Sequence, residues 1–265
     1  MKNFGKISGL GILIALALVS CRVSEPEPVA SLKDAFKDMF YIGTAMNKGQ
    51  ITGKDSTAVQ VIKEQFNAIV AENCMKSEEI QPVEGEFDFS LADPFVEFGM
   101  QNNMFVTGHC LIWHSQAPQW FFSDSEGNDV TREVLIERMK NHIFTVVTRY
   151  KGRIKGWDVV NEAFMEDGSY RDSKFYQIVG PDFIKLAFQF AHEADPDAEL
   201  YYNDYNEWFP GRRDAIVQMI RDFKAEGIRI DGIGMQGHLG LDGPSLEEYE
   251  AAIVAYAREG VKVMV

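Results

Sequence analysis

The stretch TREVLIERMKNHIFTVVTRYKGRIKGWDVVNE, residues 131–162, predicts a helix over Thr131–Tyr150 followed by a strand. Thr131 is a suitable first residue for a helix, and apolar residues recur behind it at helical spacing as far as Val147. The run Ile154–Val160 is short and rich in apolar residues, which is typical of a buried strand. The polar pair Asn161 and Glu162 follows at once. The stretch therefore indicates one unit of an α/β fold with polar chemistry at the end of its strand.

The rest of the chain repeats this alternation of short apolar runs and longer amphipathic runs. The other predicted strands are Phe40–Ala45, Ala68–Glu72, Phe105–Leu111, Glu199–Tyr202, Gly232–Met235 and Val261–Val265. The other predicted helices are Val59–Phe66, Ala92–Gln101, Pro181–Ala194, Arg212–Glu226 and Ser245–Glu259. Gly227 and Gly260 follow the last two helices, as glycines at helix ends commonly do. Strand and helix thus alternate without a low-complexity linker between them.

This alternation predicts one α/β domain with a parallel sheet. Seven predicted strands favour a (β/α)8 TIM barrel over an open doubly wound sheet, because no glycine-rich phosphate loop follows an early strand. A barrel of this kind closes only with its eighth strand. The seventh predicted strand reaches Val265, so we expect an incomplete barrel with about seven of eight strands, the last lying beyond that residue.

The N-terminal segment differs from the rest and is typical of an export signal. Lys2 and Lys6 precede the apolar run Leu10–Val19, which is too short to span a bilayer comfortably. The letters LVSC at residues 18–21 resemble a bacterial lipobox. We therefore predict a lipoprotein signal peptide at residues 1–20, lipidation of Cys21 and an extended tether at residues 21–30. An ordinary signal peptide is the alternative.

The residue after the lipidated cysteine bears on the membrane that holds the protein. Arg22 stands where many inner-membrane lipoproteins of Gram-negative bacteria carry Asp. By this resemblance we expect an exported lipoprotein of the outer membrane or cell surface of a Gram-negative bacterium. Its only membrane contact would be the lipid anchor.

The charge balance excludes some partners. The chain has 26 Lys and Arg against 40 Asp and Glu, a formal net charge of −14. Such a surface repels phosphate, and no cluster of Lys and Arg opposes it, so nucleic acid is not an expected partner. We expect no metal, because no Cys or His pair has zinc-ligand spacing. Cys74 and Cys110 are expected to be buried free thiols, with a disulfide as the alternative.

Polar and aromatic residues cluster where the predicted strands end, as in the active sites of parallel barrels. The clusters are ENCMK at 72–76, GHCLIWHSQAPQW at 108–120, WDVVNE at 157–162, NDYN at 203–206 and GMQGH at 234–238. Carboxylate, amide, Lys and His groups beside Trp and Tyr suit a sugar, whose hydroxyls need polar partners and whose ring faces stack on aromatics. Glu162 follows Asn161 at a strand end and is the candidate general acid, because a carboxyl half-enclosed by apolar and aromatic groups can protonate a leaving oxygen.

These five motifs, in this order, resemble those of glycoside hydrolase family 10, the endo-β-1,4-xylanases, over roughly residues 40 to 265. The resemblance implies that residues 31–265 are a (β/α)8 catalytic domain of that family, incomplete at its C-terminus. It also implies retaining cleavage of internal xylan linkages without a cofactor. The partner would be xylan or a xylo-oligosaccharide, and we expect a monomer.

The resemblance also implies a role for each matching residue. Glu162 would be the acid/base, and Asn161 would bond the sugar 2-hydroxyl beside the scissile bond. His238 would orient the nucleophile, with Tyr205 beside it. The residues implied to line the same subsite are His109, Trp113 and Gln236. The residues implied to hold the preceding xylose are Glu72, Asn73, Lys76 and Gln116.

The chain departs from the family pattern at the nucleophile. In the family this is a Glu in a Thr-Glu-Leu-Asp-like segment just after the seventh strand, which would lie beyond Val265. Glu247, Glu248 and Glu250 are rejected because they lie on a predicted helix. Two alternatives to the xylanase hypothesis stay open. One is a surface glycan-binding lipoprotein without turnover, and the other is a related barrel glycosidase acting on glucan or mannan.

Overall fold

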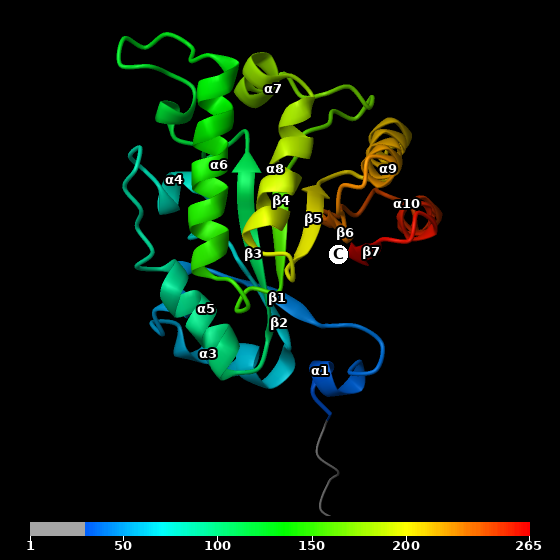
Figure 1. The fold of residues 1–265 in the computed structure, drawn as a ribbon. Coiled ribbons are helices and arrows are strands. Elements are labelled where there is room, and N and C mark those ends of the chain that lie inside the picture. The colour runs from blue at the N-terminus through cyan, green and yellow to red at the C-terminus, as the bar shows by residue number, and fades with distance from the viewer. Residues whose placement is uncertain (1–29) are drawn as a thin grey trace, which may run out of the picture. The chain divides into compact units, whose positions relative to one another are not determined.

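The computed structural model describes residues 30–265, of which residues 31–265 form one compact unit (Figure 1). The predicted signal peptide, the lipidation site Cys21 and the tether before residue 30 lie outside the described residues. Within the described range, no helix has the length and apolar character needed to cross a membrane.

A single parallel sheet of seven strands runs through this unit in the order β1-β2-β3-β4-β5-β6-β7. The strands are β1 (Gly43–Met46), β2 (Ala68–Ala71), β3 (Phe105–Trp113), β4 (Gly156–Asn161), β5 (Glu199–Asp204), β6 (Gly232–Met235) and β7 (Lys262–Met264). Every neighbouring pair is parallel. Because the spatial order of the strands equals their order in the chain, the sheet is wound like a barrel wall. In a doubly wound sheet the strand order reverses at a switch point. The predicted α/β barrel class is confirmed.

Helices connect the strands and cover the outer face of the sheet. The longer ones are α3 (Ser56–Gln65), α5 (Ala92–Gln101), α6 (Arg132–Arg149), α8 (Asp182–Ala194), α9 (Pro210–Ala225) and α10 (Leu246–Arg258). These six match the predicted helices to within a few residues. The short elements α1 (Leu32–Ala35), α2 (Lys48–Ile51), α4 (Ser77–Ile80), η1 (Gln119–Phe121) and α7 (Lys174–Val179) were not predicted. They are too short to show a helical period in the sequence.

The first strand starts later than predicted. Pairing with β2 begins at Gly43, opposite Ala68, so Phe40 and Tyr41 lie ahead of the ladder. Their side chains are 56% and 63% exposed. The predicted start at Phe40 is therefore wrong. It rested on the apolar character of this run, and periodicity does not show where a neighbouring strand begins.

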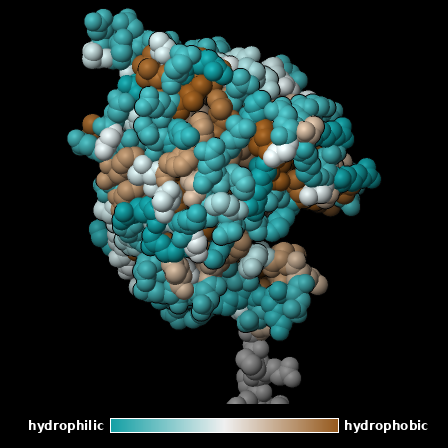
Figure 2. Space-filling view, in the orientation of Figure 1, coloured by the Kyte–Doolittle hydropathy of each residue, from teal (hydrophilic) through white to brown (hydrophobic). Residues whose placement is uncertain are grey.

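The core lies between the sheet and the helices, and β4 is buried along its whole length. Helices α6 and α8 pack against each other and against β3 and β4 (Figure 1). Trp157 on β4 is buried so close to Gly108 on β3 that a Cβ at Gly108 would lie 2.1 Å from the indole ring. Only glycine fits there. The face shown in Figure 2 is mainly hydrophilic, in keeping with the acidic composition, and apolar patches interrupt it.

Both remaining cysteines are buried free thiols, so of the two alternatives the free thiols are confirmed. Burial raises the pKa of Cys74 to about 12, which keeps this thiol protonated and unreactive at neutral pH.

His142 is fully buried on α6 and ties that helix to α4. Its Nδ1 lies 2.8 Å from Gln81 Oε1, and its Nε2 lies 3.5 Å from Ser77 Oγ. The Ser77 hydroxyl in turn donates to the Leu111 carbonyl on β3. Burial lowers the pKa of His142 to about 4, so the ring is neutral in the folded protein.

This buried imidazole predicts acid sensitivity. The unfolded chain takes up the proton near pH 6.5, whereas the folded protein takes it up only near pH 4, so stability falls as the pH drops through this window. By pH 4 the loss is about 3 kcal/mol. Urea unfolding of His142→Asn between pH 4 and 7 should show a flatter pH dependence than the parent. The exposed His192→Asn control should keep the parent slope, and a flat parent curve would contradict the prediction.

Candidate active site

A pocket of about 420 Å³ opens at the carboxyl ends of the strands. All seven strands or the loops that follow them contribute lining residues. The predicted site residues that line it are Glu72, Lys76, His109, Trp113, Asn161, Glu162, Gln236 and His238. Asn73, Gln116 and Tyr205 are not among the lining residues. The structure therefore brings most of the predicted set together around one cavity.

Glu162 is held rigidly at the end of β4. Its backbone has a left-handed φ of +58°, which is costly for a residue with a side chain and is common at functional sites. Its N–H donates to the Asn203 carbonyl at 2.8 Å, and its own carbonyl accepts from Arg171 Nε at 2.8 Å. The carboxyl group accepts from Trp113 Nε1 at 3.0 Å and from Gln236 Nε2 at 3.0 Å. Both carboxyl oxygens are thus fixed before any ligand arrives.

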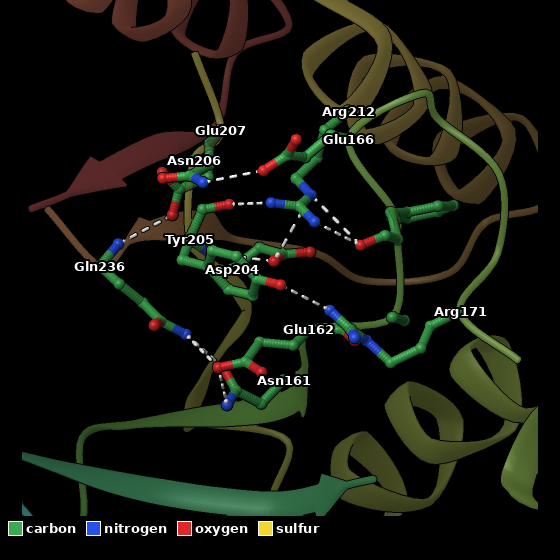
Figure 3. Close-up of polar contacts among 12 residues, drawn as sticks. Asn161, Glu162, Glu166, Arg171, Asp204, Tyr205, Asn206, Glu207, Arg212 and Gln236 are labelled. Carbon is green, nitrogen blue, oxygen red and sulfur yellow. Dashed lines mark hydrogen bonds and ion pairs between the residues drawn. The ribbon is translucent and has the colours of Figure 1, made fainter. Parts of the chain in front are cut away.

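Two amides, Asn161 at the end of β4 and Gln236 after β6, lie beside this carboxyl (Figure 3). Gln236 Nε2 also donates to Asn161 Oδ1 at 3.1 Å, and Asn161 Nδ2 donates to Glu162 Oε1 at 3.3 Å. The Oε1 of Gln236 lies 3.0 Å from Nε2 of His238, which is exposed at the pocket rim. A chain of polar contacts therefore runs from His238 through Gln236 to Glu162.

A second polar group lies on the β2 and β3 side. Lys76 is nearly buried, and its ammonium donates to Asn73 Oδ1 and Gln116 Oε1, each at 2.8 Å. The same ammonium lies 4.8 Å from the centre of the Trp113 ring. A Lys ammonium has three donors and these two bonds use two, so one remains for a ligand hydroxyl. Asn73 and Gln116 thus join the site through Lys76.

His109 has a buried partner that the sequence analysis missed. Its Nδ1 lies 2.8 Å from Asp158 Oδ2, and Asn203 Nδ2 donates to the same oxygen at 3.3 Å. A carboxylate only accepts, so Nδ1 carries the proton and Nε2 is left for a ligand. The available signal was a single acidic residue within the apolar run of strand four. Nothing in the sequence indicated its partner on the neighbouring strand.

A fully buried arginine, also missed, supports the loops after β4 and β5. The Arg212 guanidinium donates to the carbonyls of Phe164 and Tyr205, and its Nε lies 3.7 Å from Asp204 Oδ1. Burial raises the pKa of Asp204 to about 6, although the Arg212 charge opposes the rise. In the sequence Arg212 indicates only the start of a helix, because a basic residue there is usually exposed.

Tyr205 is placed by this support. Its hydroxyl accepts from Arg171 Nη2 at 3.0 Å, and the same Arg171 binds the Glu162 carbonyl. Arg171 thus contacts both Tyr205 and Glu162 and connects the two residues. In residues 30–265, no group of three or more His, Cys, Asp and Glu side chains is arranged to hold a metal ion.

Comparison with known proteins gives concordant matches. The model of glycosyl hydrolase family 10 matches residues 31–265. An endo-1,4-β-xylanase A from Xylanibacter ruminicola is 53% identical over 254 residues, which cover 96% of this chain and 68% of that protein. A solved endoxylanase of the same family, retrieved from a sugarcane soil metagenome, is 47% identical with a TM-score of 0.86, over 89% of this chain and 68% of that one.

A further solved structure carries a ligand. It is an intracellular xylanase from Thermoanaerobacterium saccharolyticum, described as the complex of a mutant with xylotetraose. It is 40% identical to this chain with a TM-score of 0.83, and the match covers 89% of this chain and 75% of that one. The relatives found by sequence and by structure are therefore similar in fold and in the activity for which they are named.

Proposed function

The chain belongs to glycosyl hydrolase family 10, and from this premise we propose that it hydrolyses internal β-1,4 linkages of xylan with retention of configuration. The observation that carries the proposal is the Glu162 carboxyl, held by three hydrogen bonds in a pocket lined with amides at the strand ends. The xylotetraose complex of a relative supports a xylo-oligosaccharide as the ligand class.

In the proposed mechanism Glu162 acts twice. It first donates a proton to the glycosidic oxygen as the C–O bond breaks and the nucleophilic carboxylate bonds to the anomeric carbon. It then takes a proton from water, which attacks the same carbon and releases the sugar. A retaining enzyme needs the second carboxylate about 5–5.5 Å from the first. We assign it to none of the described residues and propose that it follows β7, whose Met264 borders the pocket.

The remaining polar groups would bind the sugar on either side of that carboxyl. We propose that Asn161, His109 and Gln236 contact the xylose beside the scissile bond. A hydrogen bond from Asn161 to the 2-hydroxyl would strengthen in the transition state and so accelerate the reaction. Lys76 and Glu72, with Asn73 and Gln116, would hold the preceding xylose.

The lysine site gives a separate prediction. Lys76→Met should weaken binding of xylotetraose about 10-fold to 100-fold, because a hydrogen bond from a charged donor is worth about 1.5–3 kcal/mol. Isothermal titration calorimetry measures this directly. Lys140→Met, an exposed lysine on α6, is the matched control and should bind like the parent. Equal affinities of the two variants for xylotetraose, with unchanged melting temperatures, would show that Lys76 does not bind the sugar.

The substrate class is tested by comparing polymers. The full-length protein should release reducing ends from xylan much faster than from β-glucan or mannan. A preference for glucan or mannan would overturn the proposed substrate but not the proposed glycosidase chemistry. Binding of xylohexaose without hydrolysis of any polymer would instead favour the glycan-binding alternative.

A further inference from the structure

Glu207, in the loop after β5, is a buried carboxyl that the proposed mechanism does not use. Its side chain is fully buried, and it is not among the residues that line the pocket. Its Oε1 accepts from the backbone N–H of Gln236 at 2.8 Å (Figure 3). Its Oε2 is buried without a hydrogen-bond partner among residues 30–265. A buried carboxyl with one unpaired oxygen is costly, so its presence calls for a reason.

The contact with Gln236 connects Glu207 to the catalytic carboxyl. Gln236 is the first residue after β6, and its backbone N–H is shared between Glu207 and the Asp204 carbonyl, which lies 2.9 Å away. The Gln236 side chain then donates to Glu162 and Asn161. Fixing the backbone of Gln236 therefore fixes the origin of the side chain that orients Glu162.

Helix α10 holds the other side of this loop. The Tyr256 hydroxyl donates to the Glu207 carbonyl at 2.9 Å. The buried Tyr249 hydroxyl lies against Gly237, the residue after Gln236, at 3.7 Å from the position of a Cβ there. Glu207 and Tyr249 thus both lie against the turn after β6.

We propose that Glu207 is a positioning residue that acts on Glu162 through Gln236. It sets the backbone of Gln236 so that the side-chain amide lies between Glu162 and Asn161. This inference rests on the proposed function only in that the positioned group is the acid/base. The residue itself does not contact the substrate.

The protonation state of Glu207 defines its conservative replacement. Burial raises the pKa of the Glu207 carboxyl to about 8, so this group is neutral at pH 7. A neutral carboxyl that accepts a hydrogen bond through one oxygen is closely matched in shape by the amide of glutamine. Glu207→Gln should therefore retain the contact, and Glu207→Ala should lose it.

A double-mutant cycle tests the proposal in the full-length protein. Glu207→Ala should lower kcat on xylohexaose by about 10-fold to 100-fold with little change in KM, since small displacements of a catalytic group are costly. Glu207→Gln should restore kcat to within about 3-fold of the parent. In the Gln236→Ala variant, adding Glu207→Ala should lower kcat by less than about 2-fold further, because the effects of coupled residues are not additive. Multiplicative losses would overturn the proposal.

A second measurement keeps the test independent of activity. Amide hydrogen exchange at Gln236 should accelerate in Glu207→Ala and stay at the parent rate in Glu207→Gln. If the parent protein itself does not hydrolyse xylohexaose, the proposed function fails, and exchange at Gln236 still decides whether Glu207 holds this turn. Unchanged exchange in Glu207→Ala, with the fold intact by circular dichroism, would refute the inference.

Discussion

Glu162→Gln in the full-length protein is expected to lower kcat on xylan by about 100-fold to 10,000-fold, the usual contribution of general acid and base catalysis. The amide retains the shape of the side chain and one acceptor oxygen for the donors Trp113, Asn161 and Gln236. The amide is not acidic enough to protonate the leaving oxygen, and it is not basic enough to take a proton from water. Initial rates of reducing-end release over a range of xylan concentrations measure the loss.

The leaving group shows which step fails. A xylobioside with a dinitrophenolate leaving group needs no proton, so Glu162→Gln should form the glycosyl-enzyme from it and then stall. Added azide should restore turnover by replacing water as the attacking group. Glu193→Gln, an exposed carboxylate on α8, is the matched control and should behave like the parent. Full xylanase activity in Glu162→Gln would contradict the assignment.

Arg212→Met should have the largest effect on stability, about 3–5 kcal/mol of the free energy of unfolding. The substitution keeps an unbranched side chain but removes every donor to Phe164 and Tyr205. It also leaves the buried Asp204 without its cation. For a domain of this size the melting temperature should fall by about 10 °C. Calorimetry or denaturant unfolding measures the change.

The neighbouring arginine provides the control. Arg213 is partly exposed and its ion pair is with the adjacent Asp214, a surface contact worth at most about 1 kcal/mol. Arg213→Met should therefore melt close to the parent. Similar small losses for both variants would show that Arg212 is not the support of these loops.

The order of strands and helices could be predicted because α/β units repeat a strong pattern. Segments such as Thr131–Val160 combine a helical period with a short apolar run, and both signals are local. The sites at the strand ends were predictable for the same reason. Glu162 and Gln236 each follow an apolar strand directly, and parallel strands bring such ends to one edge.

The partners of the site residues could not be predicted, since they depend on contacts between distant segments. Asp158 on β4 faces His109 on β3, and Glu207 reaches Gln236 across the β5–β6 pair. A buried charge looks like an exposed one in a sequence until its partner is known. The support of the site by Arg212 was invisible for this reason.

The configuration of the first product tests the retaining mechanism most directly. Proton NMR during hydrolysis of xylohexaose by the full-length protein resolves the two anomers before they interconvert. The β-anomer of the shortened oligosaccharide should appear first, since a double displacement at the anomeric carbon retains configuration. Initial appearance of the α-anomer would contradict the retaining mechanism centred on Glu162.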